Sequence, residues 1–165
     1  MVRSRAVVVA FVATVLAGSS AVGWWIGRTA HGSTSAIVVR TLDGDTIEVR
    51  LASGSTTTIR VLGVDTPETH HPTKPVQCFG PEAAAYTRRR LLGRVVELES
   101  DVESHDIYGR RLAYVVVDGE RFDDELLRLG YARLLVIPPN EMHARAMLDA
   151  ELEARRARRG LWAAC

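Results

Sequence analysis

Three carboxylates and two arginines stand out in the sequence because each lies at the end or edge of a predicted strand. The acids are Asp45, Asp65 and Glu68, and the cations are Arg60 and Arg110. Guanidinium groups donate paired hydrogen bonds to phosphate oxygens, and carboxylates bind hard metal ions or accept a proton from water. If the fold brings these five side chains together, they have the chemistry to bind a metal ion and a phosphate.

The segment 59–69 carries three of these side chains and reads as a buried strand that runs into a turn. The apolar run 59–64 predicts the strand, and Pro67 ends it because proline has no N–H to donate to a β-ladder. Asp65 and Glu68 are therefore expected on a loop that a rigid strand holds in place.

The remaining patterns supply the elements that must position this loop. Asp43-Gly44-Asp45 predicts a hairpin turn, Pro81 begins a helix that Gly93 ends, and Asn140 is expected to cap the last helix. The predicted strands cover 37–42, 46–51, 56–64, 95–99 and 111–117, and the predicted helices cover 80–92, 122–129 and 141–159. Five strands with one helix between the third and fourth predict an α+β fold, a five-stranded OB-fold β-barrel with three α-helices.

An N-terminal hydrophobic export or anchor helix is expected before this domain. Arg3 and Arg5 precede an apolar run over 6–26, so residues 1–30 read as a signal peptide or an N-terminal membrane anchor inserted through residues 6–27. Both alternatives remain open at this point. Residues 31–36 read as a polar linker and 37–165 as the domain, which we expect to be extracytoplasmic, either secreted or anchored to the membrane.

The charge balance limits how the domain can hold a polyanion. The chain has 21 Lys and Arg against 20 Asp and Glu, but three of the arginines and none of the acids lie in the first 30 residues, which leaves a net charge of −2 beyond them. A protein that binds nucleic acid through overall charge is expected to be basic. Any polyanion must therefore be held locally.

The two cysteines, Cys78 and Cys165, are expected to pair if the chain is exported, because extracytoplasmic compartments are oxidising and the count is even. The alternative is two unpaired thiols. A bridge would tie the loop that follows the carboxylate-bearing turn to the C-terminus.

Together, these motifs resemble the staphylococcal nuclease (thermonuclease) family over roughly residues 37–162. The resemblance rests on the order and spacing of five short motifs, which are Asp-Gly-Asp-Thr at 43–46, Val-Asp-Thr-Pro-Glu-Thr at 64–69, Gly-Pro-Glu-Ala at 80–83, Tyr-Gly-Arg at 108–110 and Gly-Leu-Trp at 160–162. It implies an exported, calcium-dependent nuclease that hydrolyses DNA and RNA on the 5′-oxygen side of the phosphate and leaves 3′-phosphates.

The resemblance also implies roles for individual residues. Asp45, Asp65 and the backbone carbonyl of Thr66 match calcium-binding positions, and Glu68 matches the general base. Arg60 and Arg110 match the two catalytic arginines. Oxygen ligands of this kind suit Ca²⁺, so the physical chemistry agrees with the implied cofactor.

Substrate-binding positions match the family less completely. Lys74 and Tyr108 are kept and are expected to contact the terminal phosphate and the substrate. Ile107 replaces a common lysine, and the segment 134–139 has aliphatic residues and prolines where tyrosines pack the nucleotide. Fewer aromatic contacts predict looser or differently selective binding.

Other functions compete with a nuclease. A non-catalytic OB-fold module that binds nucleic acid or protein at the cell surface is the main alternative, because fold alone does not dictate function. The complete set of acids and arginines favours the enzyme. A structural membrane protein is a weaker alternative, and a zinc or copper site at His70 and His71 is disfavoured because no further ligand has suitable spacing. We expect a monomer.

Overall fold

The computed structural model describes residues 32–69 and 75–165. The predicted export or anchor segment, Lys74 and the His70-His71 pair lie outside the described residues. Among the described helices, none is long and apolar enough to cross a membrane.

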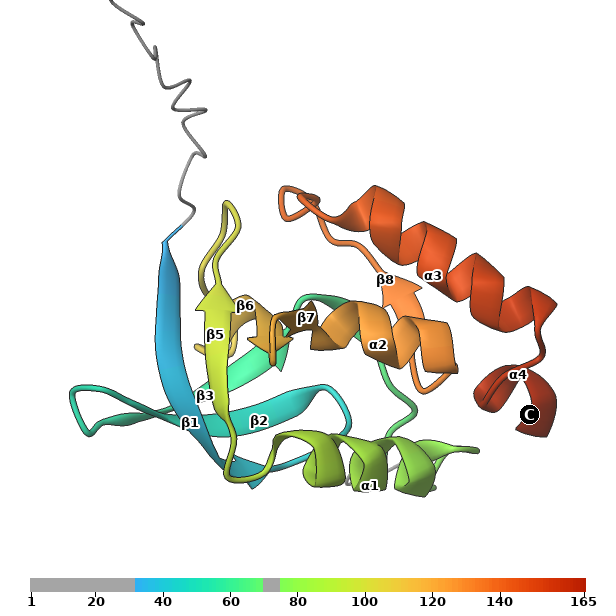
Figure 1. The fold of residues 1–165 in the computed structure, drawn as a ribbon, viewed down its shortest axis with the longest axis horizontal. Coiled ribbons are helices and arrows are strands. Elements are labelled where there is room, and N and C mark those ends of the chain that lie inside the picture. The colour runs from blue at the N-terminus through green and yellow to red at the C-terminus, as the bar shows by residue number, and fades with distance from the viewer. Residues whose placement is uncertain (1–31, 70–74) are drawn as a thin grey trace, which may run out of the picture.

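Five strands close into a barrel, as the sequence predicts (Figure 1). The elements in chain order are β1 (Ser33–Thr41), β2 (Thr46–Leu51), β3 (Thr56–Val61), β4 (Gly63–Asp65), α1 (Gly80–Leu91), β5 (Val95–Glu99), β6 (Arg111–Val117), β7 (Glu120–Arg121), α2 (Phe122–Leu129), β8 (Arg133–Leu135), α3 (Ala144–Arg156) and α4 (Leu161–Ala164). The sheet runs β3-β2-β1-β5-β6-β7, and a parallel pairing of β3 with β6 closes it. This closed arrangement, with α1 inserted after β4, is the OB-fold barrel with three main helices.

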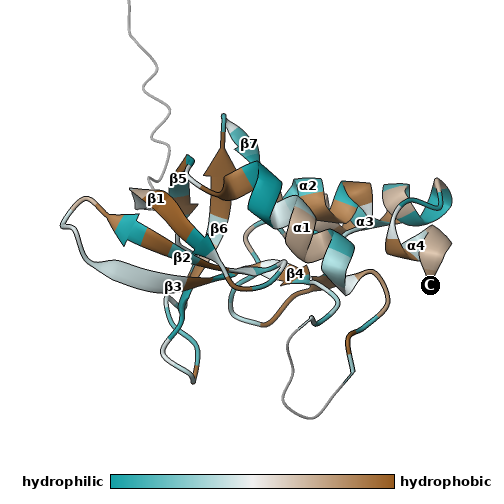
Figure 2. Ribbon diagram, turned by 90° about the horizontal axis from the view of Figure 1, so that it is seen from below, coloured by the Kyte–Doolittle hydropathy of each residue, from teal (hydrophilic) through white to brown (hydrophobic). Residues whose placement is uncertain are grey.

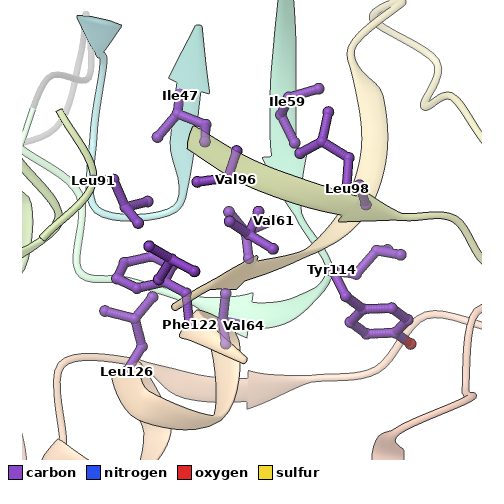
Figure 3. Close-up of a cluster of buried hydrophobic side chains, with 14 of the residues drawn as sticks. Ile47, Ile59, Val61, Val64, Leu91, Val96, Leu98, Tyr114, Phe122 and Leu126 are labelled. Carbon is purple, nitrogen blue, oxygen red and sulfur yellow. The ribbon is translucent and has the colours of Figure 1, made fainter. Parts of the chain in front are cut away.

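The core fills the barrel and continues beneath α1 and α2. Along β2 hydrophilic and hydrophobic residues alternate, as a strand with one buried face requires (Figure 2). Ile47 and Ile59 are fully buried between the strands, and Leu91, Phe122 and Leu126 bring helix side chains into the same cluster (Figure 3). Met147 and Ala150 of α3 belong to this cluster too, so three helices and the closed barrel share one core, which gives the loops at its edge a rigid base.

The predicted strand 59–64 is broken in two. β3 ends at Val61 and β4 begins at Gly63, which has φ of 74°, and a Cβ at Gly63 would overlap the side chain of Met147 from α3. Only glycine adopts this backbone conformation without cost. The break lets β4 leave the barrel and pair with β8, so that Asp65 lies opposite Arg133.

Three boundaries differ from the predictions. β1 begins at Ser33 and pairs with β5, so most of the expected linker 31–36 belongs to the strand. α3 covers Ala144–Arg156 and not 141–159, so both its ends differ, and Asn140 does not cap it. The Asn140 amide instead accepts a hydrogen bond from Glu103 N at 2.8 Å and donates one to Glu103 O at 3.0 Å. The short helix α4 had not been predicted.

A buried acid in α2 makes the stability of the fold depend on pH. Asp123 is fully buried, and neither carboxylate oxygen has a well-formed hydrogen bond to a described residue. Burial raises its pKa from 3.8 to about 7, and the charges of Asp124 and Glu99 add to the effect. Because the pKa of the folded state is the higher one, this group costs stability progressively as the pH rises from about 4 to about 7.

We therefore expect Asp123→Asn to stabilise the protein at high pH. At pH 8 the variant should exceed the wild type by at least about 1 kcal/mol in free energy of unfolding, because an amide carries no charge to bury. At pH 4 the advantage should disappear. Urea denaturation at the two pH values measures the difference, and an equal gain at both would show that ionisation of Asp123 is not its cause.

Candidate active site

Asp45 ties the first hairpin to the turn that follows β4. Its Oδ2 accepts hydrogen bonds from the backbone N–H of Thr66 at 2.9 Å and from the Thr66 hydroxyl at 3.0 Å. Its backbone carbonyl accepts from Val61 N at 2.9 Å. The carboxylate is nearly buried, so these bonds fix it firmly beside the second turn.

Arg60 lies between two carboxylates. One terminal nitrogen donates to the carbonyls of Val61 and Val64, both at 2.8 Å, and the other lies 3.4 Å from Asp45 Oδ2 and 3.3 Å from Asp65 Oδ1. The side chain is only 15% exposed. A planar guanidinium with five donors suits this position, because it braces the break at Gly63 and faces both acids at once.

The two acids beside Arg60 are close enough to affect each other. Burial raises the pKa of Asp65, and the charge of Asp45 raises it further, while Arg60 and Arg133 lower it. Two carboxylates that repel each other at a partly buried site are stabilised by a cation between them.

The donor set at this position fits a hard metal ion. Within residues 32–69 and 75–165, no group of three or more His, Cys, Asp or Glu side chains is arranged as a metal site. An ion beside Asp45 and Asp65 would therefore need backbone and water oxygens as well. Carboxylate, carbonyl and water oxygens are the ligands that Ca²⁺ takes, in flexible numbers.

Glu68 follows on the same turn and is held through its backbone. Its N–H donates to the Gln77 side-chain carbonyl at 3.1 Å, and its carbonyl accepts from Gln77 N at 2.9 Å. The next residue, Thr69, donates its hydroxyl to Asp43 Oδ1 at 2.9 Å. Burial raises the pKa of Asp43, and a hydrogen bond with the Glu68 carboxylate contributes, so these two acids lie together.

Arg110 reaches the site from the loop between β5 and β6. Asp106 accepts hydrogen bonds from its Nε at 2.7 Å and from its backbone N–H at 2.9 Å. Burial tends to raise the pKa of Asp106, but the hydrogen bonds from Arg110 and Tyr108 outweigh it and lower the pKa. The guanidinium carbon lies 5.4 Å from the centre of the Tyr108 ring, which completes its orientation.

The two arginines line one cleft. This cleft has a volume of about 450 Å³, and its wall includes Arg60, Arg110, Tyr108 and Ile107. The rest of the wall is mostly apolar and comes from β3, β4, β6, β8 and the segments that follow β5 and β8. An anion held by both arginines would therefore lie beside an apolar surface on the protein.

A model of the staphylococcal nuclease homologues matches residues 58–164 of the chain. The chain belongs to the staphylococcal nuclease family. Thermonucleases of Staphylococcus hyicus and Staphylococcus intermedius are both 40% identical to this homologue, over 76% and 78% of its length and 73% and 76% of theirs. Endonuclease YncB of Bacillus subtilis is 38% identical over 74% of this chain and 59% of its own.

In this staphylococcal nuclease homologue, most of the predicted site residues come together. Asp45, Asp65 and Thr66 meet around Arg60, and Tyr108 and Arg110 share its cleft. Glu68 lies on the same turn, while Lys74 is outside the described residues.

Cys78 and Cys165, 87 residues apart in sequence, form a disulfide with their Cα atoms 6.1 Å apart. Asp65, Thr66 and both cysteines line a second pocket of about 150 Å³.

The sequence did not reveal the residues that hold the predicted site residues in place. Asp43 was interpreted only as part of a hairpin turn, although its carboxylate reaches Thr69 across the site. Asp106, Gln77 and His143 lie outside the five motifs on which the resemblance rests. In the structure, His143 Nε2 lies 2.9 Å from Glu99 Oε2. For Asp43, the sequence did offer a signal, because it lies in the same turn as the predicted metal ligand Asp45.

Asp106 should matter to activity through Arg110. We expect Asp106→Ala to lower the rate of phosphodiester cleavage about tenfold, because Arg110 loses the bond that orients its guanidinium and the bond that holds its backbone N–H. Asp106→Asn, which keeps an oxygen acceptor, should lose less. Steady-state cleavage assays on both variants check the order, and equal rates for the alanine variant and the wild type would contradict it.

Proposed function

We propose that this homologue is a calcium-dependent nuclease that hydrolyses phosphodiester bonds of DNA and RNA on the 5′ side and leaves 3′-phosphates. Relatives named thermonuclease and endonuclease support a nuclease. The observation that carries the proposal is the position of Arg60, which contacts Asp45 and Asp65 and also lines the cleft that contains Arg110.

Asp45, Asp65 and the carbonyl of Thr66 would hold the calcium ion. When bound there, Ca²⁺ neutralises part of the phosphate charge that repels an attacking nucleophile. Two hydrogen bonds from Thr66 already hold the Asp45 carboxylate in place beside this position. Asp65 is the more exposed of the two carboxylates, so an ion can reach it from solvent.

Glu68 would take a proton from the attacking water, and the arginines would stabilise the phosphate. A carboxylate within hydrogen-bond reach of water can act as a general base. Arg60 and Arg110 donate to phosphate oxygens whose charge grows in the five-coordinate transition state, and neither loses its own proton.

The cleft supports a nucleic-acid substrate with an unstacked base. Tyr108 and Ile107 are 77% and 92% exposed at its edge, and Leu135 and Ile137 form an apolar wall. Base stacking on such a surface does not depend strongly on sequence. Lys74 would add a contact to the terminal phosphate, and aliphatic residues in place of tyrosines should make base binding weak.

Export of the protein is part of the same proposal. The apolar run 6–26 after two arginines supports a secreted protein or one anchored through residues 6–27, and a disulfide suits an oxidising compartment. A domain that closes its own barrel supports a monomer.

Analysis of the product ends tests the reaction chemistry. Denatured DNA and RNA oligonucleotides are incubated with the purified protein and Ca²⁺, and the fragments are offered to a polymerase before and after phosphatase treatment. Products that can be extended only after phosphatase treatment carry 3′-phosphates, as proposed. Products that can be extended directly carry 3′-hydroxyls and would refute this cleavage side. A folded protein that binds oligonucleotides without cutting them would favour the non-catalytic module.

A further inference from the structure

Gln77, nine residues after Glu68 in the sequence, clamps the Glu68 backbone through hydrogen bonds. Its side-chain carbonyl accepts the Glu68 N–H, its own N–H donates to the Glu68 carbonyl, and its carbonyl accepts Gly80 N at 3.1 Å. A Cβ on Gly80 would lie only 3.0 Å from the carbonyl oxygens of Pro67 and Glu68. The peptide before and after Glu68 is therefore enclosed by Gln77 and the first turn of α1.

The segment that carries Gln77 has little packing of its own. Residues 75–78 are all exposed, and Val76 is 59% exposed, so hydrophobic burial cannot hold this segment. Two contacts hold the C-terminal end of this segment. Phe79 stacks on Tyr131 with ring centres 5.5 Å apart, and Cys78 is bonded to Cys165 at the end of α4.

The other end of the disulfide is rigid. Leu161 at the start of α4 is buried and donates its N–H to Gly130 O at 2.9 Å, which attaches α4 to the end of α2. The start of α1 and α4 lie close together at the end of the molecule away from the barrel (Figures 1 and 2). The disulfide thus fastens an exposed segment to a short helix that is attached to the core through Leu161.

We propose that Gln77 is a positioning residue for the general base Glu68, and that the Cys78–Cys165 disulfide is the anchor that keeps Gln77 in place. This inference rests on the proposed function. The clamp uses only backbone atoms of Glu68, so it fixes the residue without occupying the carboxylate that takes the proton. Asp43 accepts hydrogen bonds from the hydroxyl and the backbone N–H of Thr69, so the residue after the base is held as well.

Amide hydrogen exchange at Glu68 tests the clamp without reference to activity. Gln77→Met keeps the length of the side chain and removes the acceptor, so exchange of the Glu68 N–H should accelerate at least about fivefold, as expected for the loss of one hydrogen bond. Gln77→Glu keeps an acceptor oxygen and should stay close to the wild type. Val76→Ala, at the exposed neighbour, is the matched control. Unchanged exchange in Gln77→Met would overturn the clamp.

Kinetics then test the effect on the base. Gln77→Met should lower kcat about tenfold while KM changes less than about twofold, because substrate binding is untouched and only the alignment of the base is lost. Gln77→Glu should restore most of the rate. A Gln77→Met enzyme with the kcat of the wild type would overturn the positioning role, and so would equal loss in both variants.

The double variant Cys78→Ser with Cys165→Ser tests the anchor. Both the exchange rate of the Glu68 amide and kcat should change in the same direction as in Gln77→Met, with amides in β2 still protected if the barrel remains folded. Wild-type exchange and kcat in this folded variant would remove the disulfide from the proposal. Inactivity of the wild type would instead refute the proposed function, and the exchange result would still decide whether Gln77 clamps Glu68.

Discussion

Replacing Glu68 by glutamine should lower the rate of phosphodiester hydrolysis at least about a hundredfold, which corresponds to about 2.7 kcal/mol of lost transition-state stabilisation. The amide keeps the shape of the side chain but cannot take a proton from water. Its backbone clamp to Gln77 should remain, because that clamp uses no side-chain atom of Glu68. The loss should therefore fall on kcat, with KM little changed.

Steady-state kinetics on single-stranded DNA at saturating calcium measure this effect. Glu120→Gln is the matched control, since Glu120 is an exposed residue of β7 outside the cleft. The control should keep the rate of the wild type. A Glu68→Gln enzyme within a few-fold of the wild type would mean that another group accepts the proton, and Asp43, which lies beside the Glu68 carboxylate, would be the next residue to test.

Arg60→Lys should also cost at least about a hundredfold in rate, although the charge is kept. A single ammonium cannot reproduce the arrangement in which one guanidinium nitrogen donates to Val61 and Val64 and the other faces Asp45 and Asp65. It also cannot donate a paired hydrogen bond to a phosphate. Both the preorganisation of the turn and the contact with the transition state would therefore be lost.

The matched control for this variant is Arg50→Lys, because Arg50 is exposed at the end of β2. Circular dichroism should show that both variants are folded at the assay temperature. An Arg60→Lys enzyme that is folded and as active as Arg50→Lys would remove Arg60 from the mechanism and leave Arg110 as the only arginine that acts on the phosphate.

Much of this fold follows from local signals in the sequence. α2 has the predicted bounds because Gly130, with φ of 74°, ends it in a left-handed conformation that glycine favours. The five strands and the place of α1 follow from alternation and turn residues. These features depend on neighbours in the chain, and for that reason a reading of the sequence can find them.

The features that the sequence did not reveal depend on contacts between distant residues. Met147 of α3 packs against the break at Gly63 and leaves no room for a Cβ there, and Asn140 is held by Glu103, 37 residues away, in place of capping α3. The same holds in the site. Asp45, Asp65 and Arg60 were predicted from motifs, whereas the contacts made by Asp43 and Gln77 emerge only when the loops are folded together.

The most direct test of the account is the rate of cleavage of denatured DNA by the purified protein, measured with Ca²⁺, with excess chelator, and after Ca²⁺ is restored. We predict rapid cleavage that the chelator abolishes and added Ca²⁺ recovers, because the oxygens of Asp45, Asp65 and Thr66 repel a phosphate unless a cation lies between them. Cleavage that continues at the same rate in chelator would contradict a calcium-dependent nuclease.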